Sequence, residues 1–189
     1  MTRDQVYTAP ALAGGVKRYS TWPTITQQTV SQHCWRVACL YVEIFGMPRA
    51  EVLYYCLHHD SGELWAGDIP FMVKDKTPGL REASQKAEQE GFQRLGIALP
   101  ELTCEEKAWV KIIDILEMHE FGCHELKLGN TYAQPIINDT REAALDLADT
   151  WDKKDLVETW CNKHKGKPPC PRSVKGWRLW PQKCMEYIT

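Results

Sequence analysis

The chain has 189 residues, of which 43% are hydrophobic and 25% charged, and its formal net charge is -2. This composition is ordinary for a soluble globular protein, and the length suits one domain with a sizeable core. Because the charges nearly balance and no apolar run approaches the ~18 residues of a membrane-spanning helix, we expect neither a nucleic-acid polymer nor a membrane as partner.

The first predicted helix opens at a capping box, in which Thr29 is the N-cap and Gln32 reaches back to it. Apolar residues near helical spacing then continue as far as Gly46, which predicts a helix ending there. His33 falls on this apolar stripe, where a lone histidine is more often a core residue than a ligand.

A second helix follows closely, since Pro48 suits the first turn of a helix. It is expected to end at His59 and Asp60, an imidazole followed directly by a carboxylate. Pro70 and Pro78 then bracket a predicted loop.

Two further helices are expected in the middle of the chain. Residues 80–90 predict an exposed helix that stops at Gly91. A second capping box, with Thr103 as N-cap and Glu106 at the third helical position, opens a helix with an apolar stripe over 105–121.

The last predicted helix covers residues 139–164, before a tail rich in Pro, Lys and Trp from about residue 166. Alternating strand patterns and internal repeats are absent from the sequence, so we expect an all-α fold, a helical bundle. The expected division is a main domain over residues 1–145, with a C-terminal helix and tail over 146–189 packed on it.

Eight cysteines are too dilute for a disulfide scaffold. Cys161, His164, Cys170 and Cys184 have the chemistry of metal ligands, but their spacing lacks the paired C-x-x-C knuckles of zinc modules. A structural zinc site and reduced thiols both stay open as interpretations.

Four polar residues stand out on the predicted helices. His33, His59, Asp60 and Asp114 offer two imidazoles and two carboxylates, a mixed set suited to a divalent cation with open coordination positions. Asp114 interrupts an apolar run, where a carboxylate is costly unless it is paired or bound to a cation, and Lys111 one turn earlier could simply neutralise it. Whether the four converge is not decided by the sequence.

These residues carry a family resemblance. The order His33, His59-Asp60, Asp114 resembles the HD-domain phosphohydrolases. The stretch HDSGELWAGDIP (59–70), followed by Lys74, resembles the H-D-x-x-E-x-x-x-G-D-x-P-x-x-x-K signature of the bacterial deoxynucleoside 5'-monophosphatases, whose architecture also occurs in phage dATP triphosphohydrolases. The resemblance spans about residues 16–130.

The resemblance implies an HD-domain helical bundle with a bound divalent metal cation (Zn, Co, Mn or Mg). The implied metal ligands are His33, His59, Asp60 and Asp114. Glu63 matches the residue that activates or orients the attacking water, and it lies one helical turn after Asp60.

The resemblance also implies substrate-binding residues. Asp68 matches a position near the sugar hydroxyl, and Lys74 and Lys111 match groups that contact phosphate oxygens. Arg18 and Trp22 resemble the arginine and tryptophan that hold the nucleotide and shape the deoxyribose pocket.

Trp22 is not the only candidate for the role at the sugar, because only ten residues separate it from His33. That interval is short for the bacterial monophosphatases, so Tyr19 and Thr21 stay candidates for the same task.

The expected activity is hydrolysis of dATP to deoxyadenosine and triphosphate, in a phage nucleotide pathway. A deoxynucleoside 5'-monophosphatase is the alternative, and an inactive HD-fold nucleotide-binding protein is the alternative of another class. We expect a homo-oligomer, a dimer or a hexamer. Since MTRDQVYTAP lacks the apolar segment of a signal peptide, we expect the cytoplasm, or the host cytoplasm for a viral protein.

Overall fold

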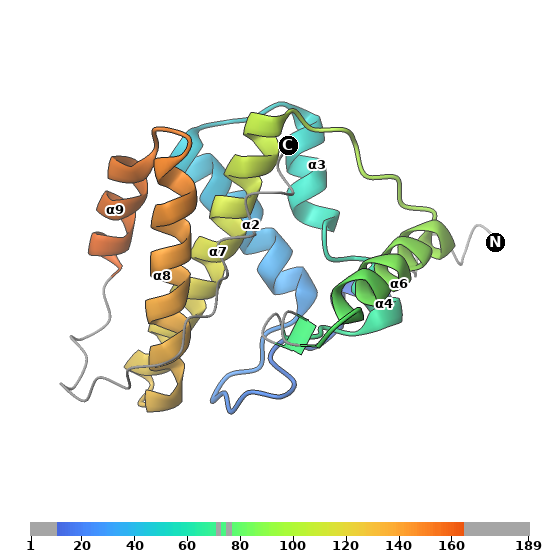
Figure 1. The fold of residues 1–189 in the computed structure, drawn as a ribbon, viewed down its shortest axis with the longest axis horizontal. Coiled ribbons are helices and arrows are strands. Elements are labelled where there is room, and N and C mark those ends of the chain that lie inside the picture. Colours follow the sequence, from blue (N-terminus) through green and yellow to red (C-terminus); the bar gives the residue numbers. More distant parts are fainter. Residues whose placement is uncertain (1–10, 71–72, 75–76, 165–189) are drawn as a thin grey trace. The chain divides into compact units, whose positions relative to one another are not determined.

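The computed structural model describes residues 11–70, 73–74 and 77–164. Within this part of the chain the structure is helical, and its only strand-like feature is an isolated bridge between Lys17 and Thr29. The bounded elements, labelled in Figure 1 where there is room, are α2 (Val30–Phe45), α3 (Ala50–His58), α4 (Glu63–Ala66), α6 (Leu80–Leu95), α7 (Cys104–Lys127), the 3-10 helix η1 (Thr131–Ala133), α8 (Gln134–Asp149) and α9 (Lys154–Lys163). None of these helices combines the length and the apolar character needed to cross a membrane.

The described residues form two compact units. The first contains the residues up to Pro23, together with Gln27–Ala38 and Arg49–Glu101. The second contains Thr24–Thr26, Cys39–Pro48 and the residues from Leu102 onwards. Helix α2 therefore contributes its first half to one unit and its second half to the other.

The start of α2 confirms the predicted capping box. The Thr29 amide donates to Gln32 Oε1 at 2.9 Å, and the Gln32 amide donates to Thr29 Oγ1 at 3.4 Å. The helix ends at Phe45, directly before Gly46, as the apolar pattern predicts. His33 is fully buried on the same face as Val30 and Val37.

The second helix starts later than predicted. Arg49 is the N-cap of α3, so Pro48 precedes the helix and is not part of its first turn. The helix ends at His58, with His59 as its C-cap, and a short helix, α4, follows at Glu63.

The expected stop at Gly91 is wrong, because α6 continues to Leu95, with Gly96 as its C-cap at a left-handed φ of 67°. Gly91 serves a close approach instead: a Cβ at this position would lie 2.4 Å from the carbonyl oxygen of Gly62. The absence of a side chain lets α6 pack directly on the chain that leads into α4.

The second unit is built around α7, beside which α8 runs (Figure 1). Its capping box is confirmed: the Thr103 amide donates to Glu106 Oε2 at 2.8 Å, and the Glu106 amide donates to Thr103 Oγ1 at 3.2 Å. The helix extends past the predicted end at residue 121, to Lys127. Its apolar stripe is core, except that Trp109 is partly exposed and stacks on Phe45 with ring centroids 4.7 Å apart.

The single helix predicted for residues 139–164 is wrong. Helix α8 begins earlier, at Gln134, with a proline in its first turn, and α9 is a separate helix. Between them Asp152 adopts a positive φ of 54°, which a continuous right-handed helix does not allow. The predicted boundary between residues 145 and 146 falls within α8, and α9 packs against α8.

The four possible zinc ligands of the C-terminal region are only partly described. Cys161 is a buried free thiol, and the ring of His164 stacks on Trp160 with centroids 4.2 Å apart. Cys170 and Cys184 lie outside the described residues.

A buried carboxylate fixes the short loop of the second unit. Glu125 is 1% exposed and accepts from the Ile25 amide at 2.6 Å, from the Thr26 amide at 2.8 Å and from Asn130 Nδ2 at 2.8 Å. Burial alone would raise the pKa of Glu125, but these bonds and one from the Thr26 hydroxyl outweigh it and lower the pKa to about 2.

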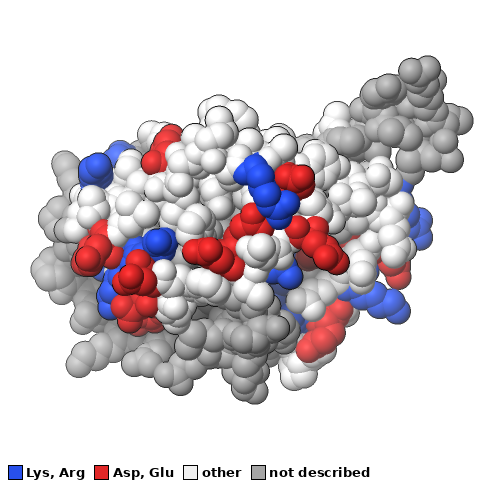
Figure 2. Space-filling model, turned by 90° about the horizontal axis from the view of Figure 1, so that it is seen from above, with Lys and Arg blue, Asp and Glu red and all other residues white. Residues whose placement is uncertain are grey.

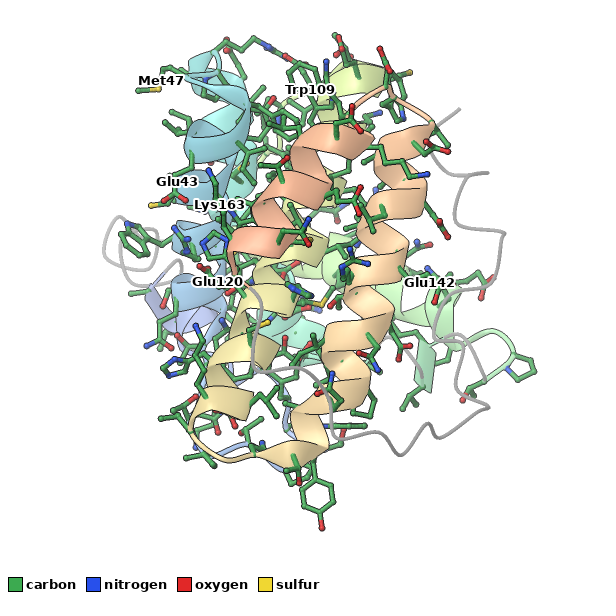
Figure 3. The ribbon with its side chains drawn as sticks, turned by 90° about the vertical axis from the view of Figure 1, so that its left-hand side faces the viewer. Glu43, Met47, Trp109, Glu120, Glu142 and Lys163 are labelled. Carbon is green, nitrogen blue, oxygen red and sulfur yellow. The ribbon has the colours of Figure 1, made fainter. Side chains whose placement is uncertain are left out.

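The surface of the second unit carries both apolar and charged side chains. Met47, just after α2, is 77% exposed, while Glu120 on α7 and Lys163 at the end of α9 bring charges to the face shown in Figure 3. Glu142 on α8 is exposed as well (Figure 3).

Candidate metal centre

Three of the predicted metal ligands meet in the first unit. His33 comes from the first turn of α2, while His59 and Asp60 follow the last turn of α3. One ligand atom from each residue can be chosen so that all lie within 4.8 Å of one another. His33 Nε2 is 3.4 Å from Asp60 Oδ2, and His59 Nε2 is 3.5 Å from Asp60 Oδ1. This group could hold a divalent cation.

The end of α3 orients the His59 ring. Its Nδ1 lies 2.9 Å from the carbonyl oxygen of Cys56, which can only accept, so Nδ1 carries the proton. The other nitrogen, Nε2, then presents a lone pair on the side of Asp60. A ligating histidine is commonly fixed in this way by a hydrogen bond from its second nitrogen.

Arg18 is a second partner of Asp60. Its side chain is 8% exposed, and Nη1 donates to Asp60 Oδ2 at 2.7 Å. The guanidinium therefore places a positive charge beside the carboxyl group that would face a cation. Arg18 lies at this position because its amide bonds to the Gln28 carbonyl next to the bridge that precedes α2.

Glu63 begins α4, directly after the cluster, and it is 6% exposed. Its Oε2 is buried without a hydrogen-bond partner among the described residues. Burial raises the pKa of Glu63, and Asp60 and Asp68 add to this, while Arg18 and Lys74 lower it; the result is about 9. A buried carboxyl group with so high a pKa beside a potential metal site is typical of functional residues.

The loop before α2 is pinned by Asp68. The amide of Tyr19 donates to Asp68 Oδ2 at 2.8 Å, and Tyr19 adopts a positive φ of 56°. The Trp22 amide closes a turn on the Tyr19 carbonyl at 3.0 Å. The Trp22 side chain is half-buried, and its Nε1 has no hydrogen-bond partner within the described residues. Asp68 thus holds the backbone next to Arg18.

Lys74 is held by α6. Its Nζ donates to Glu88 Oε1 at 2.9 Å, and the ion pair is partly buried. Because Lys74 lowers the pKa of Glu63, its ammonium group acts electrostatically on the candidate site.

The remaining two predicted residues, Asp114 and Lys111, lie on α7 in the second unit. Lys111 Nζ donates to Asp114 Oδ2 at 2.7 Å. This ion pair agrees with the interpretation that Lys111 neutralises Asp114. The role of Asp114 as fourth metal ligand stays a prediction.

Three groups that contribute to the site were not predicted from the sequence: the Cys56 carbonyl, Ser84 and Glu88. The carbonyl belongs to no motif, because any residue could supply it. Ser84, Glu88, Gly91 and Leu95 are spaced as one helical face. Because two of the four are polar, the sequence does not indicate that this face is buried.

Comparison with known proteins identifies a family and a similar fold. A family model described as 5'-deoxynucleotidase YfbR-like matches residues 14–149. No curated protein sequence matches the chain. A solved structure, "Cyanophage S-2L HD phosphohydrolase (DatZ) bound to dA and one catalytic Zn2+ ion", is similar with a TM-score of 0.58 and 19% identity, over 86% of this chain and 95% of that chain. The expected all-α HD-domain fold is confirmed.

Proposed function

Because the chain belongs to the YfbR-like family of 5'-deoxynucleotidases, it is a metal-dependent deoxynucleotide phosphohydrolase, and we propose that its substrate is dATP, which it converts to deoxyadenosine and triphosphate. The convergence of His33, His59 and Asp60 beside the buried Glu63 carries the assignment of the reaction. The choice of dATP is supported by the resemblance to phage dATP triphosphohydrolases and by the similar cyanophage protein, which is bound to dA and a catalytic zinc ion. We place the reaction in a phage nucleotide pathway, in which it would deplete dATP.

A second candidate is hydrolysis of deoxynucleoside 5'-monophosphates, which the description of the matching family model favours. Both reactions break the bond between the 5'-oxygen and the phosphorus next to it. Water supplies an oxygen to that phosphorus, and the deoxyribose oxygen leaves with a proton. The candidates therefore share a reaction centre and differ only in the phosphate chain that is released.

The donor set fits a divalent cation such as Zn, Co, Mn or Mg. We assign His33, His59 and Asp60 as ligands, with Asp114 as the fourth. When bound, such an ion neutralises charge on the phosphate and acidifies the attacking water.

Other side chains would do the rest. Glu63 accepts or directs the proton of the attacking water, for which its carboxylate form is needed. Lys74 and Lys111 meet phosphate oxygens, where negative charge is greatest. Arg18 holds the nucleotide and orients Asp60 through the ion pair described above.

Trp22 and Asp68 are assigned to the sugar. An aromatic ring at Trp22 or Tyr19 would crowd a 2'-hydroxyl and select deoxyribose. Asp68 would face the sugar hydroxyl or act indirectly, through the backbone of Tyr19 that it binds.

One face of the molecule has a charge pattern unlike that of a surface that binds a nucleic-acid polymer. On the face shown in Figure 2, basic and acidic side chains of the described residues are interspersed. A nucleic-acid-binding surface would instead gather Lys and Arg in a stripe or patch.

The deciding experiment compares dATP, dAMP, dGTP and ATP with the zinc-loaded protein and identifies phosphorus-containing products by phosphorus NMR. We expect triphosphate from dATP and little reaction with ATP. Inorganic phosphate from dAMP, with dATP untouched, would establish the 5'-nucleotidase instead. Binding of the four nucleotides without any product would indicate an inactive HD-fold protein.

A further inference from the structure

Helix α6 directs one face toward the candidate site, although most of its residues are polar. Ser84, Glu88, Gly91 and Leu95 recur at the spacing of one helical face. Ser84 and Leu95 are 2% and 5% exposed, and Gly91 is buried as well. A face that contains a buried hydroxyl and a carboxylate needs partners for both.

The partner of this polar pair is Lys74. One oxygen of Glu88, Oε1, accepts from Lys74 Nζ at 2.9 Å and from Ser84 Oγ at 2.8 Å. The side chains of Lys74 and Glu88 are only 18% and 26% exposed. Ser84, one turn before Glu88, thus fixes the carboxylate of Glu88. This carboxylate in turn holds the ammonium group of Lys74.

The main chain of Glu88 contacts the same region. A Cβ added to Gly62 would lie 2.4 Å from the Glu88 carbonyl oxygen, so the chain directly before Glu63 rests on this turn of α6. Glu88 therefore contacts the chain entering Glu63 with its backbone and holds Lys74 with its side chain.

We propose that Glu88, held by Ser84, is a positioning residue that fixes the ammonium group of Lys74 for contact with a substrate phosphate. This inference rests on the proposed function, which gives Lys74 the phosphate contact. An ammonium group has three N–H donors, so the bond to Glu88 leaves donors for phosphate oxygens. Ordering the long lysine side chain before binding reduces the entropy lost when phosphate arrives.

The opposite role for Glu88 makes the opposite prediction. A carboxylate that merely competes with phosphate for Lys74 would weaken binding, and its removal would strengthen it. The sign of the change in phosphate affinity therefore separates positioning from competition.

The experiment is calorimetric titration of the zinc-loaded protein with inorganic triphosphate. Glu88→Ala should weaken binding by about fivefold or more, as for other coupled neighbouring groups. Glu88→Gln should recover much of this loss, because its amide oxygen can accept from both Lys74 and Ser84. Glu90→Ala, which removes an exposed carboxylate from the same helix, should leave the affinity unchanged.

Two further measurements exclude a purely structural effect. Deoxyadenosine, which carries no phosphate, should bind all variants equally. In a Lys74→Ala background, Glu88→Ala should cause no additional loss, since the residue through which it acts is gone.

Tighter triphosphate binding by Glu88→Ala, an equal loss in the Lys74→Ala background, or no triphosphate binding by the unmodified protein would each overturn the inference. Failure of the unmodified protein to hydrolyse any nucleotide would instead overturn the proposed function, and the titrations would still decide the role of Glu88.

Discussion

Glu63 lies where a negative charge is costly, because burial and the neighbouring Asp60 both raise its pKa, to about 9. A cation bound at Asp60 would act in the opposite sense and favour the carboxylate, since positive charge lowers the pKa of an acid. The proton affinity of this residue is therefore linked to occupancy of the metal centre. A residue linked in this way is suited to taking a proton only when the metal is present.

Replacement of Glu63 should separate metal binding from turnover. We expect Glu63→Gln to keep its zinc and its affinity for the nucleotide while kcat falls roughly 100- to 10,000-fold, the usual contribution of a general acid or base. Zinc content and kcat for dATP are the measurements, with Glu90→Gln as the exposed control. A variant that turns over at the normal rate would remove Glu63 from the mechanism.

Replacement of Asp60 should abolish metal binding and activity together. Asp60 is the one carboxylate that meets both imidazoles of the cluster, at 3.4 and 3.5 Å. Asp60→Ala removes that ligand and also leaves Arg18 without its carboxylate. Metal content after dialysis against a weak chelator would show the loss, while Asp146→Ala, an exposed position on α8, should retain the metal. Full zinc occupancy in Asp60→Ala would contradict the ligand assignment.

At the scale of elements, the contact between α6 and the chain entering α4 depends on two glycines. A Cβ at Gly91 would lie 2.4 Å from the Gly62 carbonyl oxygen, which is backbone and cannot turn aside. We expect Gly91→Ala to lower the free energy of unfolding by ~1–3 kcal/mol, as overpacking does, despite the better helix propensity of alanine. Thermal unfolding measures the change, and kcat should fall too because Gly62 precedes Glu63. Gln89→Ala on the exposed side of α6 should change neither.

The loop held by Glu125 gives the second unit a dependence on acid. The folded pKa of about 2 lies below the ordinary value of 4.5, so the carboxylate stabilises the fold fully above pH 4.5, and this stabilisation is lost as the pH falls toward 2. Its size is on the order of 3 kcal/mol at neutral pH. Glu125→Gln should be less stable at pH 7 and show a flatter loss of stability between pH 4.5 and 2. The measurement is the free energy of unfolding in urea, determined for both proteins at a series of pH values. An equal loss of stability between pH 4.5 and 2 in the two proteins would argue against this.

Elements with a local chemical signal were predictable. Both capping boxes are confirmed, since a side chain that satisfies helix amides acts within one turn. The errors occurred where a distant contact overrides local preference. Gly91 reads as a helix stop until Gly62 packs on it, and the helix predicted over 139–164 breaks at Asp152 without a proline or glycine to announce it.

At the scale of the whole molecule, the site was predictable to the extent that it is contiguous in sequence. The stretch from His59 to Lys74 carries the family signature and supplies two of the three clustered ligands. His33 required the resemblance, because on its own it looks like a core histidine. The bracing by Glu88 could not be predicted, because it depends on the packing of α6, which no local pattern encodes.

At this scale we also predict association of whole chains. Several large apolar side chains are exposed, among them Trp35 (62%), Met47 (77%) and Tyr132 (68%). Because burying such side chains is favourable, we predict a homo-oligomer, a dimer or a hexamer. Light scattering at micromolar concentration should give a multiple of the 21.8 kDa chain mass. A monomer under these conditions would contradict the prediction.

The bonds to Glu125 can form only late in the synthesis of the chain. The amides of Ile25 and Thr26 bond to a residue 100 and 99 positions later in the chain. At ~5–20 residues per second, a ribosome needs about 5–20 s to make that interval, during which these amides lack the Glu125 carboxylate. The loop that leads into α2 therefore acquires its anchor only after both imidazoles of the metal cluster, and the whole HD stretch, have been synthesised. A nascent chain released before Glu125 would carry the metal-binding sequence without the anchor of the loop that leads into α2.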